Sequence, residues 1–193
     1  MKIDFSNSAL LIIDVQNDFC PGGALAVEDG DALIAPVNVL SSRFSESGAP
    51  VIATQDWHCE GHSSFMAQGG PWPPHCVQGG EGARFHSGLN TEPFTMILRK
   101  GFRKNLDSYS AFFENDRKTP TGLSGFLNGL NVKNIYVTGL ATEYCVFFSV
   151  IDGLDSGFCV YVVENAIGAL DRKIEGPKTL REMQKRGALI VKS

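Results

Sequence analysis

The 193-residue sequence contains no long hydrophobic run. The apolar stretch nearest its start, ALLII between Ser8 and Asp14, is too short for a secretory signal, and no other apolar stretch approaches the length of a membrane span. Positive charge is also scarce, because 17 Lys and Arg stand against 21 Asp and Glu and form no basic stripe. We therefore expect a soluble, cytoplasmic protein that binds neither membranes nor nucleic acid.

Cysteine is sparse and lacks the spacing of a disulfide framework. The five cysteines are odd in number and scattered, so we expect reduced thiols whose roles depend on their neighbours. Cys159 falls in an apolar run and is expected in the core. Cys20, Cys59 and Cys76 fall in loops, and the pattern contains no paired short spacings of the kind that build a closed structural zinc site.

Short β-branched runs alternate with helical segments along the chain. With 43% hydrophobic residues, this length suits one well-buried domain, residues 1–193. The alternation predicts an α/β fold with three αβα layers, in which helices cover both faces of a six-stranded, mostly parallel, Rossmann-like sheet. The expected strands are 9–14, 50–55, 94–100, 134–140, 158–164 and 188–192, and the expected helices are 33–44, 122–130, 142–155 and 177–186.

The region 56–93 breaks this rhythm. Nine Gly or Pro residues fall between Asp56 and Gly82, and no helical period survives there. Long irregular loops in compact domains are usually functional. The stretch VIATQDWHCEGHSSF leads into this loop and contains Asp56, His58, Cys59 and His62, which suggests a metal site, a metal-free polar loop or a zinc knot.

Reactive side chains follow several of the expected strands. Asp14 closes the first, Asp56 and His58 follow the second, Lys100 closes the third, and Cys145 starts the helix after the fourth. Taken singly, each has an ordinary structural explanation: an Asp can cap a turn, a Lys can be a solvated strand end, and a Cys can be a small buried apolar residue. Together they are expected to converge, because ligands of parallel sheets bind beyond the carboxyl ends of the strands.

Cys145 is the best candidate nucleophile in this set. The start of a helix and a nearby Lys100 are both expected to favour its thiolate. Asp14 is the nearest plausible proton carrier, and Lys100 would orient it. The turn GLATEYC is expected to present the backbone N–H groups of Ala141 and Cys145 to a developing oxyanion.

The motifs LIIDVQNDF, ATQDWH, PWPPHCVQG, ILRKG, DSYSAFF and VTGLATEYCV resemble the nicotinamidases of the isochorismatase-like cysteine hydrolase superfamily over nearly the whole chain. The resemblance implies that fold, a catalytic triad of Asp14, Lys100 and Cys145, and a cis peptide between Leu140 and Ala141. It also implies hydrolysis of nicotinamide to nicotinate and ammonia through a cysteine thioester, in NAD salvage, with pyrazinamide as a further substrate. The substrate pocket would be formed by Phe19, Leu25, Trp72, Tyr109, Ala141 and Tyr144.

The resemblance further implies one divalent metal ion at Asp56, His58 and His75. Zinc is the first expectation, and iron or manganese also suit mixed nitrogen and oxygen ligands. His62 is either a further ligand or a residue that only lines the site, and His86 has no motif behind it. A homo-oligomer is left open. The alternatives are another hydrolase of the superfamily, acting on isochorismate, a carbamoyl or a ureido compound, and a ligand-binding protein without enzymatic activity.

The sequence departs from the family pattern in two places. Phe102, Arg103 and Lys104 stand where relatives commonly have small or acidic residues, and Cys59 stands where Pro is common. These departures put the rim of the pocket in question. Cys59 beside a metal ligand could also bind metal adventitiously or be sensitive to oxidation.

Overall fold

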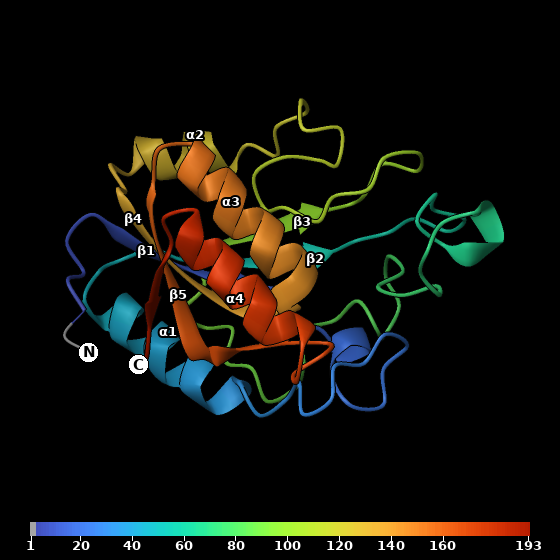
Figure 1. Cartoon of the computed structure of the whole chain (residues 1–193), viewed down its shortest axis with the longest axis horizontal. Coiled ribbons are helices and arrows are strands. Elements are labelled where there is room, and N and C mark those ends of the chain that lie inside the picture. Colours follow the sequence, from blue (N-terminus) through green and yellow to red (C-terminus); the bar gives the residue numbers. More distant parts are fainter. Residues whose placement is uncertain (1–2) are drawn as a thin grey trace.

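The computed structural model describes residues 3–193, which contain one six-stranded sheet with helices on both faces (Figure 1). All six expected strands are present, and every neighbouring pair is parallel, so the expected mostly parallel sheet is wholly parallel. Their order in the sheet is β3-β2-β1-β4-β5-β6. The strands are β1 (Ser8–Ile13), β2 (Val51–Asp56), β3 (Met96–Lys100), β4 (Asn134–Leu140), β5 (Cys159–Gly168) and β6 (Leu189–Val191).

Four α-helices cover this sheet, and Figure 1 shows α3 and α4 side by side. The helices are α1 (Ile34–Glu46), α2 (Leu123–Gly129), α3 (Phe147–Asp155) and α4 (Glu175–Lys185), with short turns η1 (Asn17–Phe19), η2 (Met66–Gln68) and η3 (Thr142–Val146). The expected helix 142–155 begins as a π-helical turn, η3, and α4 starts two residues before Pro177. Proline is tolerated there because the first helical N–H groups have no partner within the helix.

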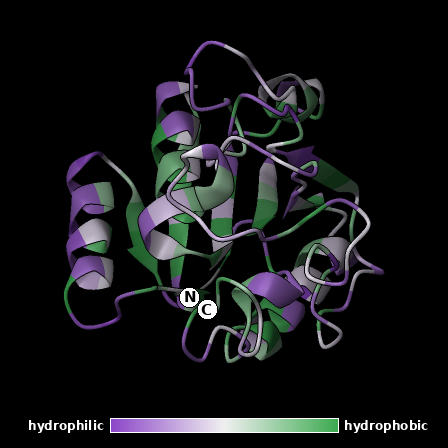
Figure 2. Ribbon diagram, turned by 90° about the vertical axis from the view of Figure 1, so that its right-hand side faces the viewer, coloured by the Kyte–Doolittle hydropathy of each residue, from purple (hydrophilic) through white to green (hydrophobic). Residues whose placement is uncertain are grey.

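Side chains of the strands divide between two hydrophobic clusters, one on each face. Leu10 and Ile12 of β1 pack with α1, whereas Leu11 and Ile13 pack with α2, α3 and α4. Every residue of β1 is buried, because helices cover both faces of a parallel sheet. In Figure 2 green predominates along the strands, with purple and white segments among them, and the outward faces of the helices are largely purple.

The strand order reverses between β1 and β4. The chain builds β1, β2 and β3 in one direction and then returns to place β4, β5 and β6 on the other side of β1. Open parallel sheets bind ligands at such a switch point, beyond the carboxyl ends of the strands. Asp14 and the segment Ala141–Cys145 follow β1 and β4 directly, so this topology brings them to one place.

One sequence-based expectation about the core is wrong. Cys159 is the first residue of β5 and is exposed, although its neighbour Val160 is fully buried. Successive side chains of a strand point to opposite faces, so an apolar run at the rim of a sheet need not bury its first member. All five cysteines have free thiols. Among residues 3–193, no helix combines the length and the apolar character needed to cross a membrane.

Gly139 is required where β4 lies closest to β1. Its φ is +106°, and a Cβ there would lie 2.0 Å from the carbonyl oxygen of Ile13. We expect Gly139→Ala to lower the free energy of unfolding by about 2 to 4 kcal/mol, measured by chemical denaturation. Gly125→Ala in α2 is the control, because its Cβ would meet open space and the change should be neutral or stabilising by less than about 1 kcal/mol. Equal effects of the two substitutions would contradict this reading.

Candidate active site and metal centre

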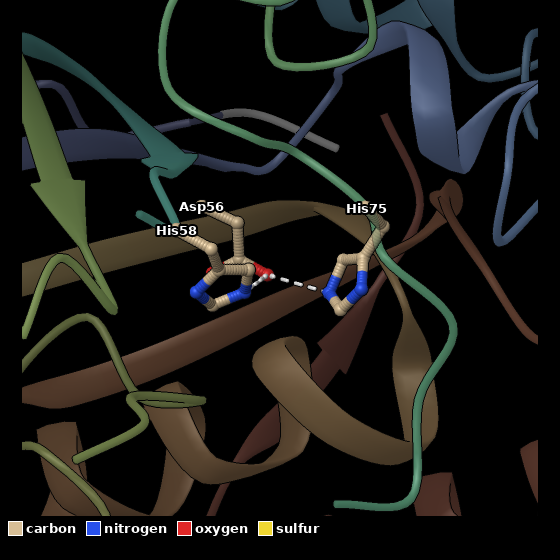
Figure 3. Close-up of side chains that lie close together, drawn as sticks. All are labelled: Asp56, His58 and His75. Carbon is tan, nitrogen blue, oxygen red and sulfur yellow. Dashed lines mark ion pairs between the residues drawn. The ribbon is translucent and has the colours of Figure 1, made fainter. Parts of the chain in front are cut away.

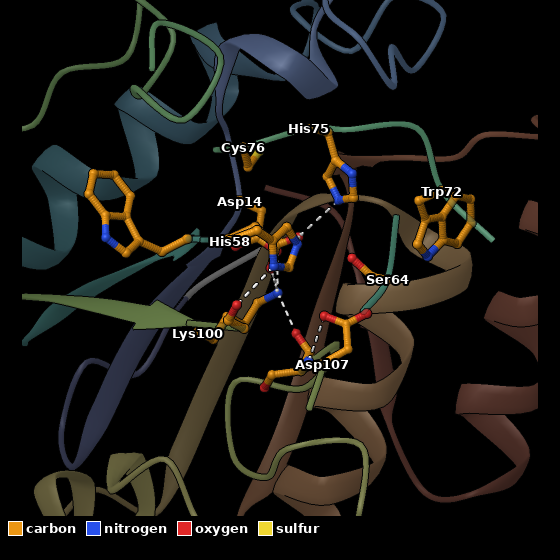
Figure 4. A network of polar contacts seen from close by, with 12 residues as sticks. Asp14, His58, Ser64, Trp72, His75, Cys76, Lys100 and Asp107 are labelled. Atoms are coloured by element: carbon orange, nitrogen blue, oxygen red, sulfur yellow. Dashed lines mark hydrogen bonds and ion pairs between the residues drawn. The ribbon is translucent and has the colours of Figure 1, made fainter. Parts of the chain in front are cut away.

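Three strand ends bring Asp14, Lys100 and Cys145 together in the interior. Asp14 and Lys100 are labelled in Figure 4. The Lys100 ammonium lies 2.8 Å from Asp14 Oδ2 and 3.4 Å from Cys145 Sγ. It also pairs with Asp56 Oδ1 and donates to the carbonyl oxygen of Ser108 at 2.9 Å. Lys100 is 1% exposed, so its charge is balanced by these carboxylates rather than by water.

Asp14 is held firmly in this arrangement. Its backbone N–H donates to Thr54 Oγ1 at 3.1 Å, and the Thr54 hydroxyl donates to Asp14 Oδ1 at 2.6 Å. Its φ of +47° is unusual for a residue other than glycine, and strain of this kind recurs at functional sites. The carboxylate is therefore oriented by Thr54 on one oxygen and by Lys100 on the other.

Burial controls the ionisation of the site. It raises the pKa of the Cys145 thiol well above its ordinary value, because the opposing charge of Lys100 is offset by Asp14 and Asp56. Lys100 favours the thiolate, as expected from the sequence, but burial and the two carboxylates outweigh it, and the sequence does not reveal that burial. Burial also raises the pKa of Asp14, which suits a carboxyl that must accept and return a proton.

Lys100 remains the positive charge of the site. Burial alone would lower the pKa of its ammonium, but Asp14 and Asp56 raise it well above the ordinary value. Asp56 responds in the opposite sense, because Lys100 and His58 overcome the effect of burial and lower its pKa. Asp56 thus stays ionised, with Oδ1 facing Lys100 and Oδ2 facing the histidines.

Asp56, His58 and His75 converge on one point beside this ionic network (Figure 3). The Nε2 atoms of His58 and His75 lie 3.6 and 3.9 Å from Asp56 Oδ2. A carbonyl can only accept a hydrogen bond, so the contacts of His58 Nδ1 with Gly101 O at 2.9 Å and of His75 Nδ1 with Pro73 O at 2.8 Å place the protons on Nδ1. Both Nε2 lone pairs are then free to bind metal.

This donor set fits a divalent transition metal. Ligand atoms about 2.1 Å from a tetrahedral metal lie roughly 3.4 Å from one another, close to the separations found here. Two imidazoles and one carboxylate leave coordination positions open, unlike a closed structural zinc site. The zinc-knot alternative lacks the thiolates, since Cys59 belongs to none of the metal-capable groups within residues 3–193.

His62 stacks on His58 and does not belong to the candidate ligand group of Asp56, His58 and His75. The two rings stack with centroids 4.3 Å apart, and the backbone N–H of Ser64 donates to His62 Nδ1 at 3.3 Å. An N–H can only donate, so the lone pair of His62 is on Nδ1 and its proton is on Nε2. His62 is absent from the pocket lining, and one of its ring nitrogens groups with His58 and Asp107 instead.

A pocket opens between Cys145 and this centre. All the expected wall residues line it: Phe19, Leu25, Trp72, Tyr109, Ala141 and Tyr144. The indole N–H of Trp72 donates to the Tyr109 hydroxyl at 2.9 Å, which joins two loops over the pocket. The peptide between Leu140 and Ala141 is cis, as the resemblance implies.

Sequence reasoning missed three lining residues, Val27, Asp107 and Leu170. Asp107 stands in the quoted motif DSYSAFF, so a signal for it existed. One of its carboxylate oxygens also groups with the ring nitrogens of His58 and His62. Val27 and Leu170 lie in irregular segments where no periodicity marks the buried side.

The departures at Phe102, Arg103 and Lys104 lie outside the pocket lining. Arg103 Nε donates to Glu114 Oε1 at 2.8 Å, and the carboxylate it meets is buried. The Arg103 guanidinium also lies 5.0 Å from the centre of the Phe102 ring. Arg103 therefore braces the loop that carries Tyr109 instead of altering the pocket itself.

Gly101 gives His58 the space it occupies. Its φ is +63°, and a Cβ there would lie 2.6 Å from His58 Cε1. We expect Gly101→Ala to displace His58 and weaken metal binding by about 10- to 100-fold, measured by competition with a chelator and by elemental analysis. Gly122→Ala is the control, since it shares the positive φ but meets open space, and metal affinity that fell equally in both variants would contradict the steric reading.

Comparison with known proteins places these features in a family. The isochorismatase domain model matches residues 8–193. The nicotinamidase of Acinetobacter baylyi is 41% identical over 182 residues, covering 86% of this chain and 83% of that protein. The crystal structure of an L. infantum protein in complex with nicotinate has a TM-score of 0.92 and 39% identity, with 100% of this chain and 96% of that chain covered. The pyrazinamidase of Pyrococcus horikoshii in complex with zinc has a TM-score of 0.89 and 40% identity, with coverage of 97% and 99%.

Proposed function

The chain belongs to the isochorismatase family, and we propose that it is a nicotinamidase, an amidohydrolase that converts nicotinamide and water to nicotinate and ammonia. The observation that carries this proposal is the pocket itself. A buried thiol with its carboxyl and ammonium partners stands at one side, and an Asp-His-His donor set stands at the other. A flat aromatic amide between them would present its carbonyl carbon to the thiol and its ring to the aromatic walls.

The first half of the reaction forms a thioester. Asp14 accepts the proton of Cys145 as Sγ attacks the carboxamide carbon, and the backbone N–H groups of Ala141 and Cys145 hold the oxyanion. Asp14 then returns the proton to the departing nitrogen, and the C–N bond breaks to release ammonia. The raised pKa of the Cys145 thiol makes this transfer necessary, because few molecules would carry a thiolate before substrate binds.

The second half returns the free enzyme. Asp14 takes a proton from a water molecule while the oxygen of that water attacks the thioester carbon. The C–S bond then breaks, the proton passes from Asp14 to Cys145 Sγ, and nicotinate leaves. Lys100 keeps Asp14 in place throughout and offsets the negative charge that accumulates beside Asp56. The product would feed a route of NAD salvage.

Asp56, His58 and His75 would hold one divalent metal ion, which supplies a Lewis acid for the lone pair of the pyridine nitrogen when bound. Zinc is the first candidate, because the Pyrococcus horikoshii relative was crystallised with it, and iron or manganese would suit the same ligands. Pyrazinamide carries a ring nitrogen in the same position as nicotinamide and is therefore proposed as a second substrate.

The test is ammonia release by the purified protein together with its elemental analysis. Nicotinamide and pyrazinamide should both be hydrolysed, with about one transition metal ion per chain. Release of ammonia from a carbamoyl or ureido compound, with none from nicotinamide, would overturn the proposal in favour of another branch of the family.

A further inference from the structure

The loop between β5 and α4, residues 169–174, is tied to the turn that carries Cys145. The carboxylate of Glu143 accepts the backbone N–H of Leu170 at 3.0 Å on one oxygen and the backbone N–H of Asp171 at 2.8 Å on the other. The neighbouring Thr142 hydroxyl donates to the carbonyl oxygen of Gly168 at 2.9 Å. The turn η3 therefore holds the last residue of β5 at one point and the start of this loop at two.

These bonds place one wall of the pocket. Leu170 lines the pocket together with Ala141 and with Tyr144 and Cys145 of η3. Glu143 holds the backbone of Leu170 itself and stands two residues before the nucleophile. The position of this wall and that of the thiol are thus set by the same five-residue turn.

The loop has few other polar ties to the rest of the chain, although Leu170 also packs against the hydrophobic cluster on the α1 side of the sheet. Arg172 pairs with Asp29 at 2.8 Å, but these side chains are 52% and 67% exposed, and such surface pairs stabilise little. The Asp171 carboxylate caps only the N–H groups of Lys173 and Ile174 within the loop. Hydrogen bonds to a carboxylate are stronger than neutral ones, so the two Glu143 contacts are the strongest polar ties of the loop.

We propose that Glu143 is a positioning residue for the reaction, which holds the 169–174 loop against the pocket and so sets the fit of the substrate ring. The nature of that substrate rests on the nicotinamidase function proposed above. Glu143 takes no part in proton transfer in this scheme. Its loss should weaken substrate binding more than it slows the chemical steps.

The test compares Glu143→Ala and Glu143→Gln with Arg172→Ala as the control. In Glu143→Ala we expect the KM for nicotinamide to rise about tenfold or more, as for the loss of charge-assisted hydrogen bonds, with a much smaller change in kcat. Hydrogen exchange at the amides of Leu170 and Asp171 should accelerate by a comparable factor, and iodoacetamide should reach Cys145 faster. Glu143→Gln keeps one amide oxygen as an acceptor and should be intermediate, whereas Arg172→Ala should resemble the unmodified protein.

Unchanged exchange at Leu170 and Asp171 in both Glu143 variants would overturn the proposal. So would a loss confined to kcat, because Glu143 would then act on the nucleophile turn and not through the loop. If Glu143→Ala fails to fold, exchange and KM in Glu143→Gln decide the matter. Exchange and alkylation need no substrate, so they test the loop contact even if nicotinamide proves not to be hydrolysed.

Discussion

Replacing Cys145 by alanine is expected to lower ammonia release from nicotinamide by about 10⁴-fold or more, and Asp14→Asn should cost a comparable factor. The two losses should be similar because the thiol is buried and its pKa is raised, so it cannot attack without the carboxyl that takes its proton. The asparagine amide would keep the shape of the side chain but could not accept a proton. The double variant should be little worse than either single one, since the two groups act as a unit.

The measurement is steady-state ammonia release, with circular dichroism and metal content to show that each variant is folded. Rapid quenching followed by mass spectrometry should locate the acyl group on Cys145 in the unmodified protein. Cys76→Ala is a matched control, because that thiol is also buried but lies outside the pocket lining. Activity above a few per cent in Cys145→Ala, or an acyl group on another cysteine, would contradict covalent catalysis at this residue.

Loss of the metal is expected to reduce nicotinamide turnover toward that of benzamide. Benzamide has the same size and the same scissile bond, but no ring nitrogen to meet the centre formed by Asp56, His58 and His75. A single coordination contact is worth roughly 3 to 4 kcal/mol, which corresponds to a factor of about 10² to 10³ in kcat/KM. Chelation and His75→Ala should have similar effects, because both remove the same contact.

The measurement is the ratio of kcat/KM for nicotinamide and benzamide, before and after chelation, in the unmodified protein and in His75→Ala. His86→Ala serves as the control, since His86 belongs to none of the metal-capable groups within residues 3–193. A nicotinamide preference that survived chelation would assign the selectivity to the aromatic walls, Phe19 and Trp72, and leave the metal another role. Chelation should change the rate of Cys145 alkylation less than it changes this ratio, because Cys145 follows a different strand from the three candidate metal ligands.

Local sequence signals predicted the architecture well because its elements are regular. Leu33, Val37, Leu40 and Phe44 repeat at helical spacing, and α1 covers residues Ile34–Glu46. The β-branched runs form six parallel strands, and the three central ones, β1, β2 and β4, are apolar enough to be buried on both faces. The expected convergence of Asp14, Lys100 and Cys145 needed only the rule that functional residues follow the carboxyl ends of parallel strands.

The six residues that the motifs named as pocket walls all line the pocket, and three further lining residues were not named. Val27 and Leu170 line the pocket from irregular segments, whose path depends on contacts such as those of Glu143 with the 169–174 loop. Hydrogen bonds between side chains and a distant backbone leave no periodic trace in a sequence. The hydrogen bond between Arg103 and Glu114 could not be predicted for the same reason, so Arg103 was expected to alter the rim of the pocket.

By itself, the sequence determined the order of strands and helices along the chain, the chemical groups that follow each strand, and the protein family. Only the tertiary structure decided how those groups are charged and oriented. Burial depth and the distances from Lys100 to Asp14, Asp56 and Cys145 set the balance that keeps the thiol protonated and Asp56 ionised. The carbonyl oxygens of Gly101 and Pro73 selected which nitrogen of each histidine faces Asp56. Residue types and spacing determine neither these charge states nor the orientation of the histidine rings. Both depend on distances and solvent access between chain segments that are far apart in the sequence.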